Sequence, residues 1–242
     1  MRKITTVFLI IFFFCALLSS CASMANDTES SQSIAQEWMH TACSKEGVKA
    51  FMAILGTIKG EGLLSGNHFD EEHCYNVTPS TVSANTDIRI FKFSDTCLSL
   101  ALIDGEVYQL CNFFGGHGFF NAVPWDYDAD GTMDLLVASS WGSGFHRSEI
   151  SVFNVKTKQS TVICSSILME NADVDWFVEI VSPSSDKYYE NSEADPFSYC
   201  VYSAEVECGD RAELSYLPNA YVGSIDLEDG APVFHPCEAG EE

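Results

Sequence analysis

The chain has 242 residues, enough for one large domain or two small ones, and 46% of them are apolar, which supports a hydrophobic core. This composition excludes a chain that is disordered throughout. The 35 acidic residues outnumber the 12 basic ones and give a formal charge of −23. Such a chain repels phosphate backbones, so nucleic-acid binding has no electrostatic basis. The same acidity is typical of extracellular proteins and of proteins that collect hard cations.

The first 20 residues predict an export signal. Arg2 and Lys3 precede Val7–Leu18, a run without any charge. A basic segment followed by an apolar one too short to cross a bilayer of ~30 Å is typical of a secretory signal peptide. Its removal would change the charge to −25, because two of the 12 basic residues leave with it.

The residues that follow predict how the exported chain is held. Leu18-Ser19-Ser20-Cys21 places an aliphatic residue and two small residues before a cysteine. This pattern resembles the lipobox of bacterial lipoproteins, which implies cleavage before Cys21 and a lipid anchor on the outer face of a bacterial membrane. Ordinary cleavage after Ala25 is the alternative and would give a secreted protein. Residues 21–33 are polar and aperiodic, which predicts a flexible tether.

From residue 34 to residue 242 the sequence predicts a single α+β domain, mainly antiparallel β, that is entered through short helices. Apolar residues recur at helical spacing from Ile34 to about Ile58, with Gly47 as the expected break. Gly56 opens a glycine-rich loop that ends the helical pattern.

Beyond residue 85 the pattern becomes that of β-strands. Residues 88–93 alternate apolar and polar side chains, and Asp104-Gly105 is a two-residue hairpin turn between strands at 97–103 and 106–111. The other expected strands are 135–139, 149–153, 160–164, 176–181, 199–207, 221–227 and 232–234, with an exposed loop at 182–195.

Ten cysteines raise the question of disulfides. One lies in the leader and one is Cys21, which leaves eight in an exported chain. In the hairpin register that Asp104-Gly105 sets, Cys97 and Cys111 point to opposite faces. Cys200 and Cys208 are too far apart along one strand, roughly 26 Å, to pair. Both disulfides and buried free thiols stay open as alternatives.

The most informative segment is an acidic loop that leads directly into a strand. Its aspartates alternate, a glycine permits a sharp turn, and a fourth carboxylate closes the set. The predicted ligands are Asp126, Asp128, Asp130, the carbonyl of Thr132, and Asp134, with Gly131 at the turn. An all-oxygen set with four carboxylates favours Ca²⁺ over softer metals.

The context of this loop excludes an EF-hand, because position 12 is Val137 and Pro124 precedes the loop where a helix would have to enter. The D-x-D-x-D-G-x-x-D pattern before a strand resembles the FG-GAP or VCBS repeat, the calcium-loop hairpin of integrin-like propellers. The resemblance covers residues 113–154. Because no second copy occurs, we expect one calcium-loop hairpin within another fold and not a closed propeller. Residues 140–148 also resemble a stretch of uncharacterised exported proteins from Gram-positive bacteria.

Other candidate chemistry is weaker. The nucleophile-elbow motif is missing around Ser143, which lies near His146, and no zinc spacing joins His68, His73 and Cys74. In so acidic a chain, chance alone places several carboxylates close together. The remaining candidates are a carboxylate pair among Asp173, Asp175 and Glu179, an ion pair of Arg147 with the acidic loop, and adhesive contacts through Trp141, Phe145 and Trp176.

The sequence therefore predicts an exported, lipid-anchored protein with one Ca²⁺-ordered hairpin. We expect a structural or ligand-binding role without catalysis, with the membrane as a partner through Cys21 and a protein or glycan ligand left open. The alternative is an extracellular hydrolase with an acidic active site assembled from scattered residues.

Overall fold

The computed structural model describes residues 43–58, 69–111, 115–142, 147–167, 175–181, 197–205, 215–228 and 231–236. All of them belong to one compact unit, 41–242. The predicted leader, Cys21, the tether and the start of the helical entry lie outside these residues. In the described part of the chain, no helix has the length and apolarity that crossing a membrane requires.

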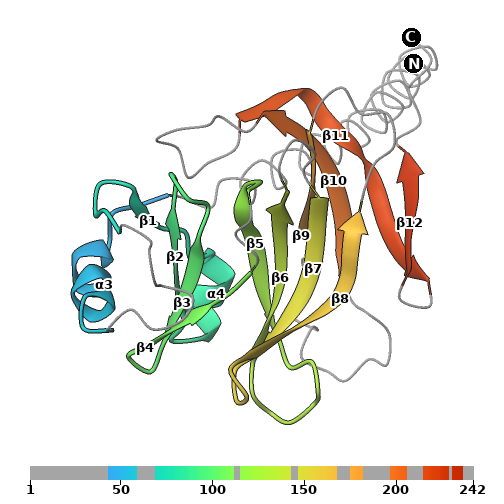
Figure 1. Ribbon diagram of the computed structural model, residues 1–242. Helices are drawn as coiled ribbons and strands as arrows, with labels where there is room; N and C mark the ends of the chain where they lie inside the picture. Colours follow the sequence, from blue (N-terminus) through green and yellow to red (C-terminus); the bar gives the residue numbers. More distant parts are fainter. Residues whose placement is uncertain are drawn as a thin grey trace, which may run out of the picture. The chain divides into compact units, whose positions relative to one another are not determined.

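Among the described residues, twelve strands form three four-stranded antiparallel sheets, each with its strands in chain order (Figure 1). Sheet I contains β1 (Cys74–Asn76), β2 (Arg89–Phe93), β3 (Ser99–Ile103) and β4 (Glu106–Gln109). Sheet II contains β5 (Gly118–Trp125), β6 (Asp134–Trp141), β7 (Arg147–Asn154) and β8 (Gln159–Ile167). Sheet III contains β9 (Asp175–Val181), β10 (Ser198–Glu205), β11 (Ser215–Glu228) and β12 (Ala231–Pro236).

Two short helices accompany sheet I among the described residues, α3 (Val48–Leu55) and α4 (Ser80–Asn85). Helix α3 begins after Gly47, whose φ of +73° suits a glycine. Its apolar residues pack on one face of sheet I, where the ring of Phe51 stacks on that of Phe91 with centroids 4.0 Å apart.

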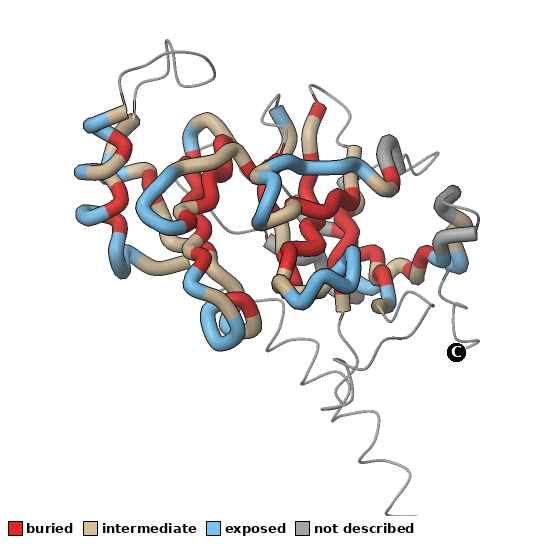
Figure 2. Tube along the Cα trace, turned by 90° about the horizontal axis from the view of Figure 1, so that it is seen from below, coloured by how far each residue is buried: buried red, intermediate tan, exposed pale blue. Residues whose placement is uncertain are grey.

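Sheet II is buried on both faces. Leu135 and Val137 of β6 pack against Ile90 and Ala101 of sheet I, whereas Leu136 packs against the apolar face of sheet III. Successive side chains of a strand point to opposite faces, so β6 needs a continuous apolar run to serve both interfaces. Figure 2 shows buried residues along the inner segments of the trace and exposed residues at its outer bends.

One edge of sheet II is joined to sheet III by a side chain. Asn121 of β5 donates from Nδ2 to the carbonyl oxygen of Ile180 in β9 at 2.8 Å and accepts from the amide of Ile180 at 3.1 Å. The amide side chain thus satisfies both backbone groups of Ile180.

The mainly antiparallel β class is confirmed, and no closed propeller is formed by the described strands. The Asp104-Gly105 hairpin is also confirmed, with Leu100 opposite Gln109. Three elements were not expected from the sequence: β1, the six-residue helix α4, and β5.

Candidate metal site in the β5–β6 loop

The acidic loop is the connection of a β-hairpin. Trp125 ends β5 and pairs with Asp134, the first residue of β6, so residues 126–133 form the loop between them. Val137 lies within β6. The loop therefore has a strand on each side, of which the sequence pattern predicts the second, β6.

Hydrogen bonds to Asp126 wrap the loop. Its Oδ1 accepts the amide of Asp130 and its Oδ2 accepts the amide of Gly131, both at 2.9 Å. Gly131 has a φ of +82°, so the sharp turn expected there is present. Ala129 also has a positive φ, 56°, which the sequence does not announce.

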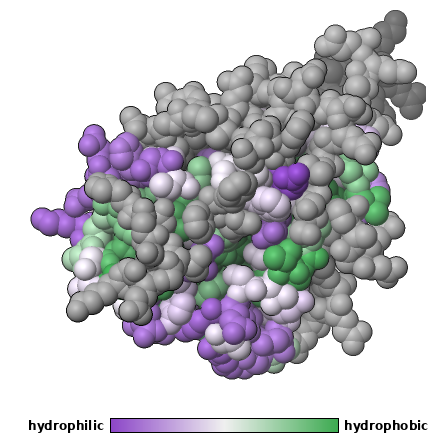
Figure 3. Space-filling view, viewed as in Figure 1, coloured by the Kyte–Doolittle hydropathy of each residue, from purple (hydrophilic) through white to green (hydrophobic). Residues whose placement is uncertain are grey.

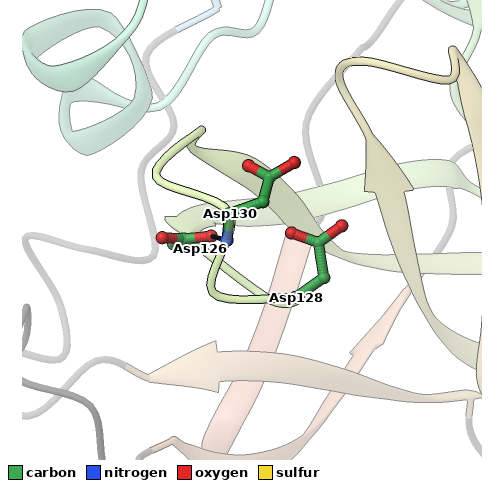
Figure 4. A group of neighbouring side chains, drawn as sticks. All are labelled: Asp126, Asp128 and Asp130. Atoms are coloured by element: carbon green, nitrogen blue, oxygen red, sulfur yellow. Dashed lines mark hydrogen bonds between the residues drawn. The ribbon is translucent and has the colours of Figure 1, made fainter.

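Three carboxylates come together in this loop. Asp126, Asp128 and Asp130 each offer an oxygen, and these oxygens lie within 4.8 Å of one another (Figure 4). Calcium–oxygen distances are about 2.3–2.6 Å, so oxygens on opposite sides of one ion are roughly 5 Å apart. The three separations are therefore compatible with one shared Ca²⁺. Each oxygen of Asp126 has a second lone pair beyond its hydrogen bond.

Asp134 does not belong to this group of three side chains, and the ligand expected from Thr132 is a backbone carbonyl, which such a group does not include. Asp134 is only 1% exposed, and its Oδ1 accepts the amide of Val155 at 2.8 Å. Burial raises the pKa of Asp134, the hydrogen bond from Val155 opposes that change, and the other three aspartates add to it. The amide of Thr132 donates to Oδ1 of Asp130 at 2.8 Å.

The β7–β8 turn supplies two polar groups that the sequence pattern does not reveal. Asn154 donates from Nδ2 to Asp128 at 3.2 Å and to Asp134 at 3.4 Å. Its Oδ1 accepts the amides of Lys156 and Thr157, so the same side chain shapes its own turn. An asparagine at the end of a strand is a turn signal, but its contact with the acidic loop depends on the pairing of β6 with β7.

Lys156 places a cation at the loop. Its Nζ lies 2.6 Å from Oδ2 of Asp130, and this hydrogen bond lowers the pKa of Asp130. The same contact raises the pKa of Lys156, and the charges of the nearby aspartates add to the effect. In Figure 3, hydrophilic residues gather at the lower end, where Figure 1 places the β5–β6 loop and the β7–β8 turn.

The weaker candidates are scattered. Ser143, Phe145, His146, His68 and Asp173 lie outside the described residues. Cys74 is buried in β1. Arg147 was expected to pair with the acidic loop, but its guanidinium lies over the ring of Trp141, 5.1 Å from the ring centroid. Trp176 is partly buried; its ring contacts that of Phe234, and both pack against the core between sheets II and III. Among the residues that the structure describes, the three aspartates form the one group of potential metal ligands.

Glu179 is the candidate carboxylate with the clearest perturbation. It lies in β9, is 3% exposed, and burial raises its pKa to about 8. Asp175 begins the same strand, but its side chain is not described. A perturbed carboxyl is typical of general acids, yet a second carboxylate is needed for glycoside hydrolysis.

Comparison of the chain with family models, with curated proteins and with solved structures gave no match.

Proposed function

We propose that this protein is an exported, lipid-anchored calcium-binding protein of structural or ligand-binding type. The observation that supports this proposal best is the convergence of Asp126, Asp128 and Asp130 within 4.8 Å in a hairpin loop. The resemblance to a single FG-GAP or VCBS calcium loop agrees with the strands on both sides of it. Within the proposal, residues 34–242 are one α+β domain with a helical entry and residues 1–33 provide export, anchor and tether.

Calcium would neutralise charges that now repel one another. Four aspartates lie within nine residues, and Lys156 compensates only part of that charge. Oxygen ligands in an irregular surface loop suit Ca²⁺, whose coordination geometry is flexible, better than Mg²⁺, which demands near-ideal octahedral geometry. Asp134, held by Val155 and Asn154, would support the loop from its buried end.

The test is a calcium titration of the purified protein followed by its melting temperature. Extracellular calcium modules have dissociation constants of ~10⁻⁴–10⁻³ M. At about 1 mM free Ca²⁺ and a Kd of ~0.1 mM, linkage gives roughly 1.4 kcal/mol of stabilisation. In a domain of this size that is about 3–6 °C in Tm. Equal concentrations of Mg²⁺ should give a smaller shift.

Matched variants locate the site. Asp130→Ala should abolish the calcium-dependent shift, whereas Asp95→Ala, at an exposed aspartate in the β2–β3 turn, should keep it. Identical melting of the wild type in chelator and in millimolar Ca²⁺, with no binding heat in calorimetry, would show that the loop is only an acidic turn.

The anchor has a separate test. Mass spectrometry of the membrane-associated protein should find a diacylglyceryl group on an N-terminal Cys21. A mature chain that begins at Asn26 would instead identify a secreted protein.

A further inference from the structure

A lysine is buried where sheet I meets sheet II. Lys92 of β2 is 1% exposed, in a chain where acidic residues greatly outnumber basic ones. Its Nζ lies 2.6 Å from Nε2 of His117 and 3.4 Å from the carbonyl oxygen of Phe119, at the start of β5. The ammonium of sheet I thus binds the segment that opens sheet II.

His117 contacts all three sheets. Besides Lys92 of sheet I, its ring meets the ring of Phe120 in sheet II at 6.3 Å and that of Phe177 in sheet III at 6.0 Å, both edge-on. Four residues further along the chain, Asn121 bonds to the backbone of β9. Residues 117–121 therefore join the three sheets at one place.

Glycines on both sides hold His117 in this position. A Cβ on Gly116 would lie 2.6 Å from the Cα of Trp141, and one on Gly118 would lie 2.2 Å from the carbonyl oxygen of Cys97. Both glycines have positive φ, +67° and +76°. This backbone fits only when both residues are glycine, and it brings the segment that carries His117 against the backbone of Cys97.

The contact tolerates one positive charge, on Lys92, and not a second one on His117. An ammonium is only a donor, so Nε2 of His117 accepts and the ring is neutral, with its hydrogen on Nδ1. Burial lowers the pKa of Lys92 to about 8. At pH 7 the ammonium therefore persists. A proton added to Nε2 would put two cations against each other in a buried place.

We propose that the contact between Lys92 and His117 is an acid-released latch: protonation of His117 below neutral pH breaks it and loosens sheet I from sheets II and III. Unfolded histidine binds a proton near pH 6.5. Folded His117 resists that proton, so the unfolded or opened chain binds one more proton and acid favours it. The latch is independent of the calcium loop.

The other titratable groups near the contact do not mimic this behaviour. Burial raises the pKa of Cys111 to about 12, so this thiol stays neutral throughout. Cys43 and Cys97 form no disulfide. Burial raises the pKa of Glu149 on β7 and, to about 8, that of Glu179 on β9, the strand that carries Phe177. Both carboxyls make the folded chain bind a proton more readily and oppose acid unfolding.

The first test compares full-length wild type with His117→Gln and Lys92→Met in urea unfolding from pH 7.5 to pH 5. Glutamine offers an oxygen to the ammonium and does not titrate. We expect the unfolding constant of the wild type to rise about 30-fold more than that of His117→Gln, one proton's worth over this interval. Lys92→Met removes the cation that faces His117. The unfolding constant of this variant should therefore rise only a few-fold more than that of His117→Gln over the same pH interval. Equal pH dependence of wild type and His117→Gln would overturn the proposal.

The second test needs no variant and covers a failure of His117→Gln to fold. Hydrogen exchange of the wild type, corrected for intrinsic rates, should show the amides of β2 and β3 losing protection at pH 5 while those of β10 and β11 keep it. A uniform loss across the three sheets would contradict an opening at the latch.

A third test repeats the urea series with Glu149→Gln added to the wild type and to His117→Gln. The difference in pH dependence between the two should remain unchanged. Loss of that difference would assign it to Glu149 and overturn the proposal.

Discussion

The ammonium of Lys156 lies 2.6 Å from Oδ2 of Asp130, within the group of carboxylates that would hold a metal ion. The two residues come from different turns, β7–β8 and β5–β6, which the pairing of β6 with β7 brings together. Lys156 therefore acts as a tethered cation at the loop. An incoming Ca²⁺ must either displace this ammonium from Asp130 or share the Asp130 carboxylate with it.

Removing the tethered cation should strengthen calcium binding. We expect Lys156→Met to lower the Kd for Ca²⁺ about two- to fivefold at low ionic strength, a range that fits the small coupling energies of exposed ion pairs. The effect should shrink in about 0.5 M salt because exposed charges are screened. Isothermal titration calorimetry measures both.

Lys158→Met is the matched control, because Lys158 lies in the same turn but is 3.7 Å from Asp104 in the β3–β4 turn. Its Kd should remain that of the wild type. Unchanged or weaker calcium binding in Lys156→Met would contradict a competing role for the ammonium.

Asn154 should stabilise the loop through hydrogen bonds alone. It bonds to Asp128 and Asp134 and accepts two amides of its own turn, so Asn154→Ala should cost about 1–2 kcal/mol of unfolding free energy in chelator. Asn154→Asp keeps the acceptor for the turn but turns a carboxylate toward two others. We therefore expect it to be less stable than wild type in chelator and to gain more from Ca²⁺. Chemical denaturation in both conditions measures this, and equal gains in wild type and Asn154→Asp would argue against a metal near this side chain.

The raised pKa of Asp134 predicts an unusual pH dependence. Its ionised form is disfavoured by burial, so the folded chain carries a penalty above the raised pKa that disappears in acid. In chelator at pH 7, Asp134→Asn should be more stable than the wild type, and the difference should vanish as the pH falls toward 3.9, the ordinary aspartate value. Urea unfolding between pH 7 and pH 3.5 measures it.

Asp130→Asn gives the opposite sign and serves as the control. Lys156 lowers the pKa of Asp130, so its ionised form stabilises the fold at pH 7 and that stabilisation is lost in acid. If Asp134→Asn were instead less stable than the wild type in chelator at pH 7, the prediction would be wrong. Because asparagine can also accept the amide of Val155, the ionised Asp134 would then have to make a different stabilising interaction.

The acidic loop could be predicted from sequence because its contacts are local. Asp126 bonds to amides four and five residues ahead, and Gly131 makes the turn in the same stretch. Asn154 and Lys156 could not be predicted as neighbours of the loop, since they reach it only through the register of two strands. For the same reason the sequence did not pair Lys92 with His117, which is 25 residues away and directly precedes the first strand of another sheet.

Strand β5 escaped prediction because its pattern does not alternate. A bulge between Phe119 and Asn121 shifts the register. Phe119 and Ala122 consequently face the core shared with sheet I, whereas Phe120 and Val123 face the core shared with sheet III. Pro124 also argues against a strand, but β5 lies at the edge of sheet II, where a missing amide is tolerated.

Two glycines with similar backbone angles should respond very differently to alanine. Gly118 has a φ of +76° and Gly105 a φ of +83°, so alanine is strained at both by about 1 kcal/mol. Around Gly105 a new Cβ would meet nothing within 4 Å, whereas at Gly118 it would lie 2.2 Å from the carbonyl oxygen of Cys97. That oxygen belongs to the backbone, so relief of the clash requires β5 to move away from sheet I, and His117 would then leave Lys92.

We therefore expect the free energy of unfolding in urea to fall by about 1 kcal/mol in Gly105→Ala and by about 3 kcal/mol or more in Gly118→Ala. Similar losses in the two variants would show that the segment before β5 can shift without cost, and that its close approach to Cys97 does not hold the sheets together.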